Sequence, residues 1–273
     1  LPTYMTPKGR VKKRSSLIGT FSFQKDATTG IIDIAMITSL GREDNINELV
    51  RNYGMVIVDE CHHAAAVTHE NVLRAVTARY IYGMSATINR GDKQDKKMFM
   101  QLGPIRHRYT AKERAQKQGI GHYIYPRFTR LVDLNQSEDR NPADYYRLSM
   151  QSELRNMQIV SDTLACVKRG RTPVVMTKYK EHAHKLYDML QGSADHVFLL
   201  QGGKSLKERA AIREDMAAVR ADESIILVAI GQYVGEGFNY PRLDTMLLAM
   251  PISFEGNVEQ HAGRLNRDYE GKK

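Results

Sequence analysis

The chain contains the segment Val56-Ile57-Val58-Asp59-Glu60-Cys61-His62, an apolar run that ends in two adjacent carboxylates. The apolar run predicts a parallel strand that is buried on both faces. Asp59 and Glu60 would then emerge at its carboxyl end, where open α/β sheets bind their ligands. There Asp59 would hold a hydrated Mg²⁺, and Glu60 would orient and deprotonate an attacking water. The segment therefore indicates a candidate ATPase.

A second apolar run follows in Tyr80-Ile81-Tyr82-Gly83-Met84-Ser85-Ala86-Thr87. It ends in two small hydroxyl residues, Ser85 and Thr87, which could hydrogen-bond the preceding carboxylates. Taken alone, a Ser-Ala-Thr group is more typical of the cap of a following helix. The order and distance of the other motifs decide between these two interpretations.

Four segments follow one another in a characteristic order: Asp59–His62, Ser85–Thr87, Val234–Asn239 and Gln260–Arg267. They resemble motifs II, III, V and VI of superfamily 2 helicases, and the resemblance runs from about Ile18 to the end of the chain. It is closest to the restriction-type and excision-repair-type DNA helicases. The resemblance implies two RecA-like domains that clamp ATP between them.

The same resemblance implies roles for individual residues at an ATP site. It places Glu60, Asp59, Arg264, Arg267 and Gln260 in catalysis, and Gly235, Gly237, Asn239, His62, Ser85 and Thr87 at the nucleotide. Arg267 would be the arginine finger, and His62 would couple the ATP site to motif III. The family usually has aspartate where this chain has Asn239, but asparagine can still accept a hydrogen bond from a ribose hydroxyl.

Arg264 and Arg267 are three residues apart, so on a helix both guanidinium groups could point from one face. Planar, permanently charged guanidinium groups suit phosphate oxygens. The alternative is a basic helix face that is bridged to nearby acids, which is the usual meaning of an isolated Arg-x-x-Arg. The motif context favours the phosphate site.

The resemblance also implies which residues would contact nucleic acid. They are Thr38, Ser39, Thr177, Lys178, Gln201, Gly202 and Gly203. The net charge of +9 and the pI near 9.4 also favour a polyanionic partner. DNA is expected more than RNA, because the resemblance is to DNA helicases. No array of stacking aromatic residues is evident in the sequence.

A phosphate-binding loop is missing before Asp59. None of Gly9, Gly19, Gly30, Gly41 and Gly54 is followed by Lys-Ser or Lys-Thr, as such a loop requires. The chain therefore resembles a fragment whose upstream segment carries the loop. The same reasoning predicts that apolar surface of the first sheet would be left exposed.

Strands alternate with helices along the chain, which predicts an α/β fold with parallel sheets. The predicted strands cover 31–37, 55–59, 79–84, 173–177, 196–200, 224–230 and 243–250, and a long helix is predicted from Tyr145 to Lys168. We expect a first RecA-like domain at 1–124, incomplete at its N-terminus. We expect a second at 125–273, cut short at its C-terminus.

The amino-acid composition indicates the general kind of protein. With 42% hydrophobic and 26% charged residues, the chain is expected to be globular. It has no apolar run of membrane-spanning length and only two cysteines, so we expect a cytoplasmic protein. Cys61, His62, His63 and His69 suggest a zinc hydrolase as a competing class, but their spacing matches no common zinc motif.

The sequence thus predicts a parent ATP-dependent DNA helicase or translocase that uses ATP and Mg²⁺. The chain alone would be inactive in hydrolysis. The alternative is a nucleic-acid-binding module without catalysis.

Overall fold

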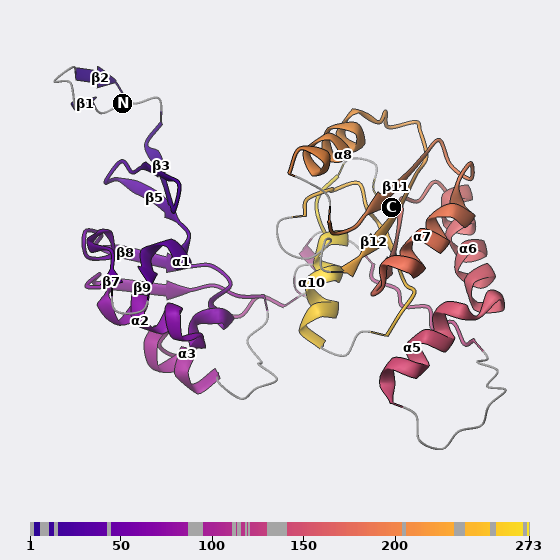
Figure 1. Cartoon of the computed structure of the whole chain (residues 1–273), viewed down its shortest axis with the longest axis horizontal. Helices are drawn as coiled ribbons and strands as arrows, with labels where there is room; N and C mark the ends of the chain where they lie inside the picture. The colour runs from indigo at the N-terminus through magenta and orange to yellow at the C-terminus, as the bar shows by residue number, and fades with distance from the viewer. Residues whose placement is uncertain are drawn as a thin grey trace. The chain divides into compact units, whose positions relative to one another are not determined.

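The computed structural model describes residues 3–5, 11–13, 16–42, 45–86, 95–110, 113, 116–117, 119, 121–129, 141–203, 206–231, 238–251, 255–269 and 272. The chain divides into two compact units, Leu1–Arg108 and Tyr109–Lys273. Both units combine helices and strands (Figure 1). The fold class is mixed α/β with parallel sheets, as predicted. The domain ranges 1–124 and 125–273 stay a prediction, because compactness alone does not locate helicase domains.

The first unit contains several small sheets. Its strands are β1 (Thr3–Met5), β2 (Val11–Lys13), β3 (Ile18–Ser22), β4 (Lys25–Ala27), β5 (Ile32–Ala35), β6 (Gly41–Arg42), β7 (Asn45–Ile46), β8 (Met55–Val58) and β9 (Tyr80–Gly83). The pairs β1–β2 and β6–β7 are antiparallel, and β3 lies between antiparallel β4 and parallel β5. β8 and β9 are parallel, so both deliver their carboxyl ends to the same edge.

Helical segments connect and cover these strands. They are α1 (Ile37–Leu40), η1 (Glu48–Arg51), η2 (Cys61–Ala65), α2 (Val67–Ala75) and α3 (Asp95–Leu102). Buried Cys61, Ala64, Leu73 and Met98 form the core beneath them, and Val58 of β8 packs against that core. The helices thus protect one face of the β8–β9 pair.

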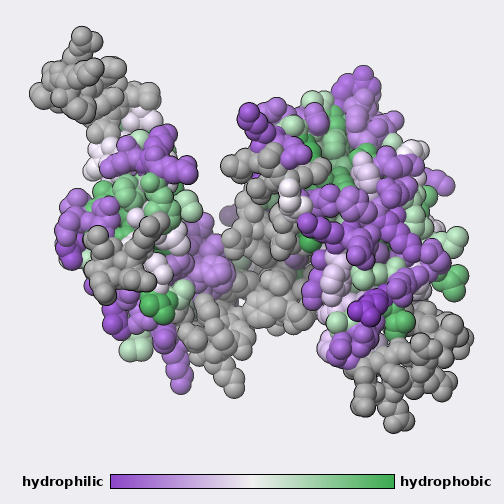
Figure 2. Space-filling model, in the orientation of Figure 1, coloured by the Kyte–Doolittle hydropathy of each residue, from purple (hydrophilic) through white to green (hydrophobic). Residues whose placement is uncertain are grey.

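The opposite face of this pair is exposed, which corrects the prediction that β8 is buried on both faces. Met55 and Ile57 are 52% and 56% exposed, and Tyr80 and Tyr82 beside them are 44% and 48% exposed. Figure 2 shows hydrophobic atoms at the surface of this unit. The physical reason is that, in the part of the unit that the structure describes, the helical core packs only on the Val58 side.

The second unit is built on one parallel sheet. Its strands are β10 (Pro173–Thr177), β11 (His196–Leu200), β12 (Ile225–Ile230) and β13 (Thr245–Leu248), in the order β11-β12-β10-β13. Every residue of the central strands β10 and β12 is buried. Such continuous burial is typical of parallel strands with helices on both faces.

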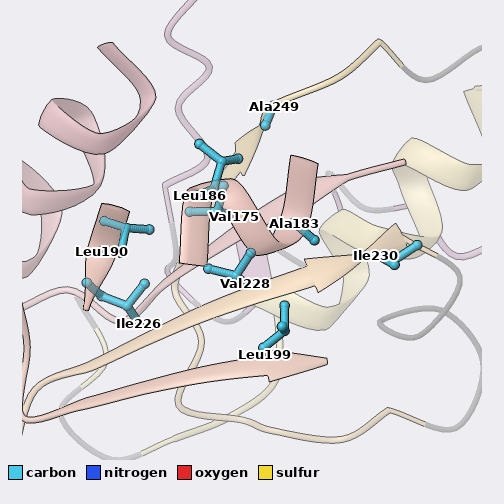
Figure 3. Packing of buried hydrophobic residues seen from close by; sticks show 9 residues of the cluster. All are labelled: Val175, Ala183, Leu186, Leu190, Leu199, Ile226, Val228, Ile230 and Ala249. Atoms are coloured by element: carbon cyan, nitrogen blue, oxygen red, sulfur yellow. The ribbon is translucent and has the colours of Figure 1, made fainter. Parts of the chain in front are cut away.

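Helices cover both faces of this sheet (Figure 1). The helices described in this unit are α5 (Pro142–Gln151), α6 (Glu153–Lys168), α7 (Lys180–Leu190), α8 (Leu206–Ala218) and α10 (Glu255–Leu265). On one face, Leu186 and Leu190 of α7 pack on Val175 and Val228, with α6 beside them (Figure 3). On the other face, Met216 of α8 packs on Leu227.

The single helix predicted from Tyr145 to Lys168 is wrong. The structure has α5 and α6 instead, and they are separated by Ser152. Ser152 has extended backbone angles, and its hydroxyl accepts a hydrogen bond from the amide of Arg155 as the N-cap of α6. A serine that satisfies free amide groups in this way favours a new helix start over continuation.

The surface of the second unit is mainly hydrophilic in the view of Figure 2. Among the helices within the described ranges, none is long and apolar enough to cross a membrane. Cys61 and Cys166 are both free thiols.

Candidate functional site

Asp59 and Glu60 lie directly after β8, at its carboxyl end. Asp59 is exposed, and its Oδ1 accepts a hydrogen bond of 2.9 Å from the amide of Glu60. Glu60 has φ 47° and ψ 46°, a left-handed conformation that costs a non-glycine residue about 1–3 kcal/mol. Its side chain is 31% exposed. Both carboxylates are thus open to a ligand, and carboxylate oxygens are suitable ligands for hydrated Mg²⁺.

The ends of β8 and β9 are joined by backbone and side-chain contacts. The amide of Met84 donates to the carbonyl of Val58 over 2.8 Å, and the amide of Cys61 donates to the carbonyl of Met84 over 2.9 Å. His62 Nδ1 lies 2.9 Å from Ser85 Oγ and 3.3 Å from Glu60 Oε2. One histidine ring therefore contacts both the acid of motif II and the hydroxyl of motif III. Thr87, the other hydroxyl residue, lies outside the described residues.

The histidines beside this site do not form a metal centre. The rings of His62 and His63 are 4.1 Å apart and tilted, and Cys61 Sγ lies 3.9 Å from Met98 Sδ in the core. Burial raises the pKa of the Cys61 thiol, which disfavours the thiolate that zinc requires. Within the described ranges, no three His, Cys, Asp or Glu residues are grouped so that they could hold a metal ion. The geometry thus gives no support to the zinc hydrolase.

Thr38 and Ser39 lie in the short helix α1 of the first unit. Thr38 is exposed, whereas Ser39 is half-buried. The Oγ atom of Ser39 is buried without a hydrogen-bond partner among the residues that the structure describes. Ser39 therefore has hydrogen-bonding capacity that these residues do not use.

Thr177 and Lys178 mark the carboxyl end of β10 in the second unit, and they differ in exposure. Thr177 is 4% exposed, and its Oγ1 lies 2.8 Å from His182 Nδ1. His182 Nε2 lies 2.9 Å from Asn156 Oδ1, and burial lowers the pKa of His182 to about 4. The hydroxyl of Thr177 is thus engaged inside the fold, and its assignment to the nucleic-acid side stays a prediction. Lys178 is exposed and remains a candidate.

Gln201, Gly202 and Gly203 follow β11 at the same edge of this sheet. Gly203 has φ +88°, and a Cβ atom there would lie 3.5 Å from Lys180 Nζ. Only glycine adopts such a φ without strain. Gln201 Oε1 is buried without a hydrogen-bond partner among the described residues. A lysine and a backbone turn therefore lie side by side at this edge.

Motif VI differs from its predicted geometry. Arg264 is in the last turn of α10, but the helix ends at Leu265, so Arg267 lies beyond it. The prediction that both arginines share one helical turn is therefore wrong. Arg267 Nη1 donates a hydrogen bond to Oδ1 of Asn239, and Lys272 Nζ donates to the carbonyl of Arg267 over 3.0 Å. These contacts hold Arg267 beside motif V.

Other motif V and VI residues are less fully described. Gln260 lies in α10, and the structure describes its backbone only. Gly235 and Gly237 lie outside the described residues. His261, which the sequence interpretation did not use, is 6% exposed, and its Nε2 would lie 3.6 Å from a Cβ placed on Gly231 after β12. Its position within motif VI was the available signal.

The sequence of the chain is similar to those of known proteins. A family model described as "Type III restriction enzyme, res subunit" matches residues 5–90. Probable helicase D10 of Escherichia phage T5 is 25% identical over 270 residues, which cover 94% of this chain and 54% of that protein. The chain thus spans about half the length of this relative.

Two solved structures have a similar fold. A fragment of a putative HsdR subunit of a type I restriction enzyme from Vibrio vulnificus YJ016 matches with a TM-score of 0.57 and 15% identity, over 92% of this chain and 47% of that one. A variant of S. cerevisiae Dbp5 bound to RNA and ADP BeF3 matches with a TM-score of 0.51 and 11% identity, over 93% of this chain and 61% of that one.

These likenesses show that the chain has the mixed α/β fold of those RecA-like structures. The chain is thus similar to a restriction-enzyme family model over residues 5–90 and to a probable phage helicase over most of its length.

Proposed function

We propose that the chain is part of an ATP-dependent DNA helicase or translocase, in which ATP hydrolysis drives movement along nucleic acid. The observation that carries this proposal is the contact of His62 with Glu60 and Ser85. This contact joins the carboxyl ends of two parallel strands, so a displacement of Glu60 would be carried to Ser85 after β9. Such a link is what a protein needs in order to couple nucleotide chemistry to movement.

The residues of the site fit a magnesium nucleotide in part. Asp59 would hold the metal through water, and Glu60 would accept a proton from the attacking water. Bound ATP would supply the phosphoryl group whose hydrolysis releases free energy. Ser85, Thr87, Gly235, Gly237 and Asn239 would line the nucleotide, while Arg264, Arg267 and Gln260 would contact its phosphates. A phosphate loop before Asp59 is missing from the sequence.

We assign that loop to a further N-terminal segment of the same polypeptide. The exposed apolar face of β8 and β9 supports this assignment, because Met55, Ile57, Tyr80 and Tyr82 are the kind of surface that further strands and helices cover. A segment that packs there would complete the first unit. It would also place its loop near the carboxyl ends of the strands, since ligands bind at that edge of α/β sheets.

The nucleic-acid side rests on charge and on exposed groups. The net charge of +9 attracts phosphate, and Lys178 and Lys180 are exposed at one edge of the second sheet. Gln201, Gly202 and Gly203 supply backbone groups there, and Thr38 and Ser39 would contact the strand from the first unit. We propose DNA as the partner because the motifs resemble those of restriction-type and excision-repair-type DNA helicases.

The alternative function is a nucleic-acid-binding module without catalysis. The two can be separated with the 273-residue chain and with a longer protein that includes a phosphate loop. The chain alone should bind DNA with an affinity that falls steeply as salt rises and depends little on base sequence. It should show no DNA-stimulated ATP hydrolysis, because no lysine holds the β and γ phosphates.

If the isolated chain hydrolyses ATP in a DNA-stimulated way, and Glu60→Gln abolishes this turnover, the proposal that the phosphate loop lies in a further segment is refuted. If the longer protein also lacks ATP hydrolysis, the module without catalysis is correct. Binding that is independent of salt would overturn the nucleic-acid role in either form.

A further inference from the structure

Three side chains gather at the carboxyl end of β10: Tyr146 of α5, Lys178 and Tyr179. Lys178 Nζ lies 4.6 Å from the centre of the Tyr146 ring and 5.8 Å from that of Tyr179. The two rings are 6.1 Å apart and inclined at 56°. Lys178 is exposed, and both tyrosines are half-buried, so the group lies at the surface. We name Tyr146, Lys178 and Tyr179 the aromatic-lysine cluster.

A buried chain of hydrogen bonds positions this cluster. Asn156 Nδ2 donates to the carbonyl of Met150 over 2.8 Å, and its Oδ1 lies 2.9 Å from His182 Nε2. His182 Nδ1 in turn lies 2.8 Å from Thr177 Oγ1. Met150 is in the same helix as Tyr146, and Thr177 directly precedes Lys178. The network therefore fixes the helix that carries one ring relative to the strand end that carries the other.

The lysines and tyrosine rings at the cluster could bind a polyanion that carries flat aromatic groups. Lys180 follows Tyr179 in the chain and approaches the Gly203 turn. An ammonium group over a ring face is attracted to it by roughly 0.5–1 kcal/mol at an exposed site, which is weak enough for a phosphate to compete. When the ammonium group moves to a phosphate, the face of Tyr146 becomes free. A nucleobase has a face of the same kind, and stacking is tolerant of its identity.

We propose that the aromatic-lysine cluster stacks one unpaired base of a nucleic-acid strand, with Lys178 on an adjacent phosphate. This inference rests on the proposed function, in which the protein acts on nucleic acid, and it adds preference for a single strand. The inclined rings form a corner, so one ring stacks on the base and the other contacts its edge. A base in a duplex cannot reach this corner without first leaving its stack and its pair.

The test compares two probes of about 15 nucleotides, an oligothymidylate and an abasic oligonucleotide with the same phosphodeoxyribose backbone, by fluorescence anisotropy. We expect the 273-residue chain to bind the intact strand about tenfold more tightly than the abasic strand. Tyr146→Ala should remove most of that ratio, and Tyr146→Phe should keep it. Lys178→Ala should weaken both probes by the same factor and reduce the salt slope by about one.

Tyr145→Ala is the matched control, because Tyr145 is 53% exposed on the same helix but has no part in the cluster. Tyr179→Leu is a second test that leaves α5 unchanged, so the inference does not depend on the folding of Tyr146→Ala. Base stacking is overturned if the wild type binds both probes with equal affinity, or if the ratio of the two affinities is unchanged in Tyr146→Ala and Tyr179→Leu. Either result leaves the proposed nucleic-acid role intact. If the wild type binds neither probe, the nucleic-acid role fails as well.

Discussion

Gly83 determines how closely the ends of β8 and β9 approach each other. A Cβ atom at Gly83 would lie 2.8 Å from Cys61 Sγ and 2.8 Å from Leu102 Cδ1. Both neighbours belong to elements that pack against the candidate ATP site. The contact of His62 with Ser85 therefore depends on a residue that has no side chain of its own.

Gly83→Ala should destabilise the first unit by about 1–3 kcal/mol, because an added methyl group forces the packed neighbours apart. Chemical denaturation monitored by circular dichroism would measure this. Gly54→Ala is the control, since nothing lies within 4 Å of a Cβ placed there. Equal stability of Gly83→Ala and Gly54→Ala would mean that the close packing at Gly83 is not a constraint.

At the scale of elements, the hydrogen-bonded chain through Asn156, His182 and Thr177 joins α6, α7 and β10. Asn156 uses its amide nitrogen as a donor to the carbonyl of Met150, so its oxygen accepts from His182 Nε2. His182 Nδ1 then accepts from the hydroxyl of Thr177. This arrangement needs a neutral imidazole, and burial lowers the pKa of His182 to about 4.

The stability of the second unit should therefore depend on pH through His182. Its pKa is lowered from 6.5 to about 4 on folding, so the unfolded chain takes up the proton first as pH falls. The contribution is fully present above pH 6.5 and is lost as pH falls towards 4, by at most about 3 kcal/mol.

Urea denaturation at several pH values would measure this effect. His182→Gln should flatten the dependence of unfolding free energy on pH, whereas His184→Gln, an exposed position on the same helix, should leave it unchanged. An identical pH dependence of His182→Gln and the wild type would contradict the neutral buried imidazole.

Local sequence patterns predicted the elements well where one physical effect dominates. The mainly apolar segments of β10 and β12 gave buried parallel strands because burial of apolar side chains dominates there. The break at Ser152 was missed because a capping hydroxyl competes with helix periodicity. Arg267 was placed on the helix of Arg264 because spacing does not reveal where a helix ends.

Contacts between distant residues could not be predicted from the sequence. Tyr146 meets Lys178 only because α5 is held against the end of β10, and no motif spans that separation. The composition of β8 predicted burial on both faces, whereas the missing loop predicted exposed apolar surface on the first sheet, and the structure has one exposed face. A strand's composition does not say which elements will cover it. The site residues of motifs II and III could be proposed from the sequence because each motif is a short continuous segment.

On the scale of the whole molecule, the proposed catalytic groups follow strand β8 in the first unit and lie at the end of helix α10 in the second. The first unit carries Asp59 and Glu60, and the second carries Arg264 and Arg267. We propose that ATP binding brings these groups to one nucleotide in the intact parent. Asp59→Ala should weaken magnesium-dependent nucleotide binding as well as turnover, because its partner would be the metal.

The decisive measurement is ATP turnover by a longer protein that includes the phosphate loop, with and without Arg267→Ala. Arg267 should stabilise charge that develops on the γ-phosphate, so its removal should lower kcat by about a thousandfold and change nucleotide affinity much less. Arg267→Lys should rescue poorly, because a single ammonium group does not reproduce the planar fork. Thermal melts confirm that each variant folds. Hydrolysis at the wild-type rate by Arg267→Ala would show that Arg267 belongs to a basic surface and not to a catalytic site.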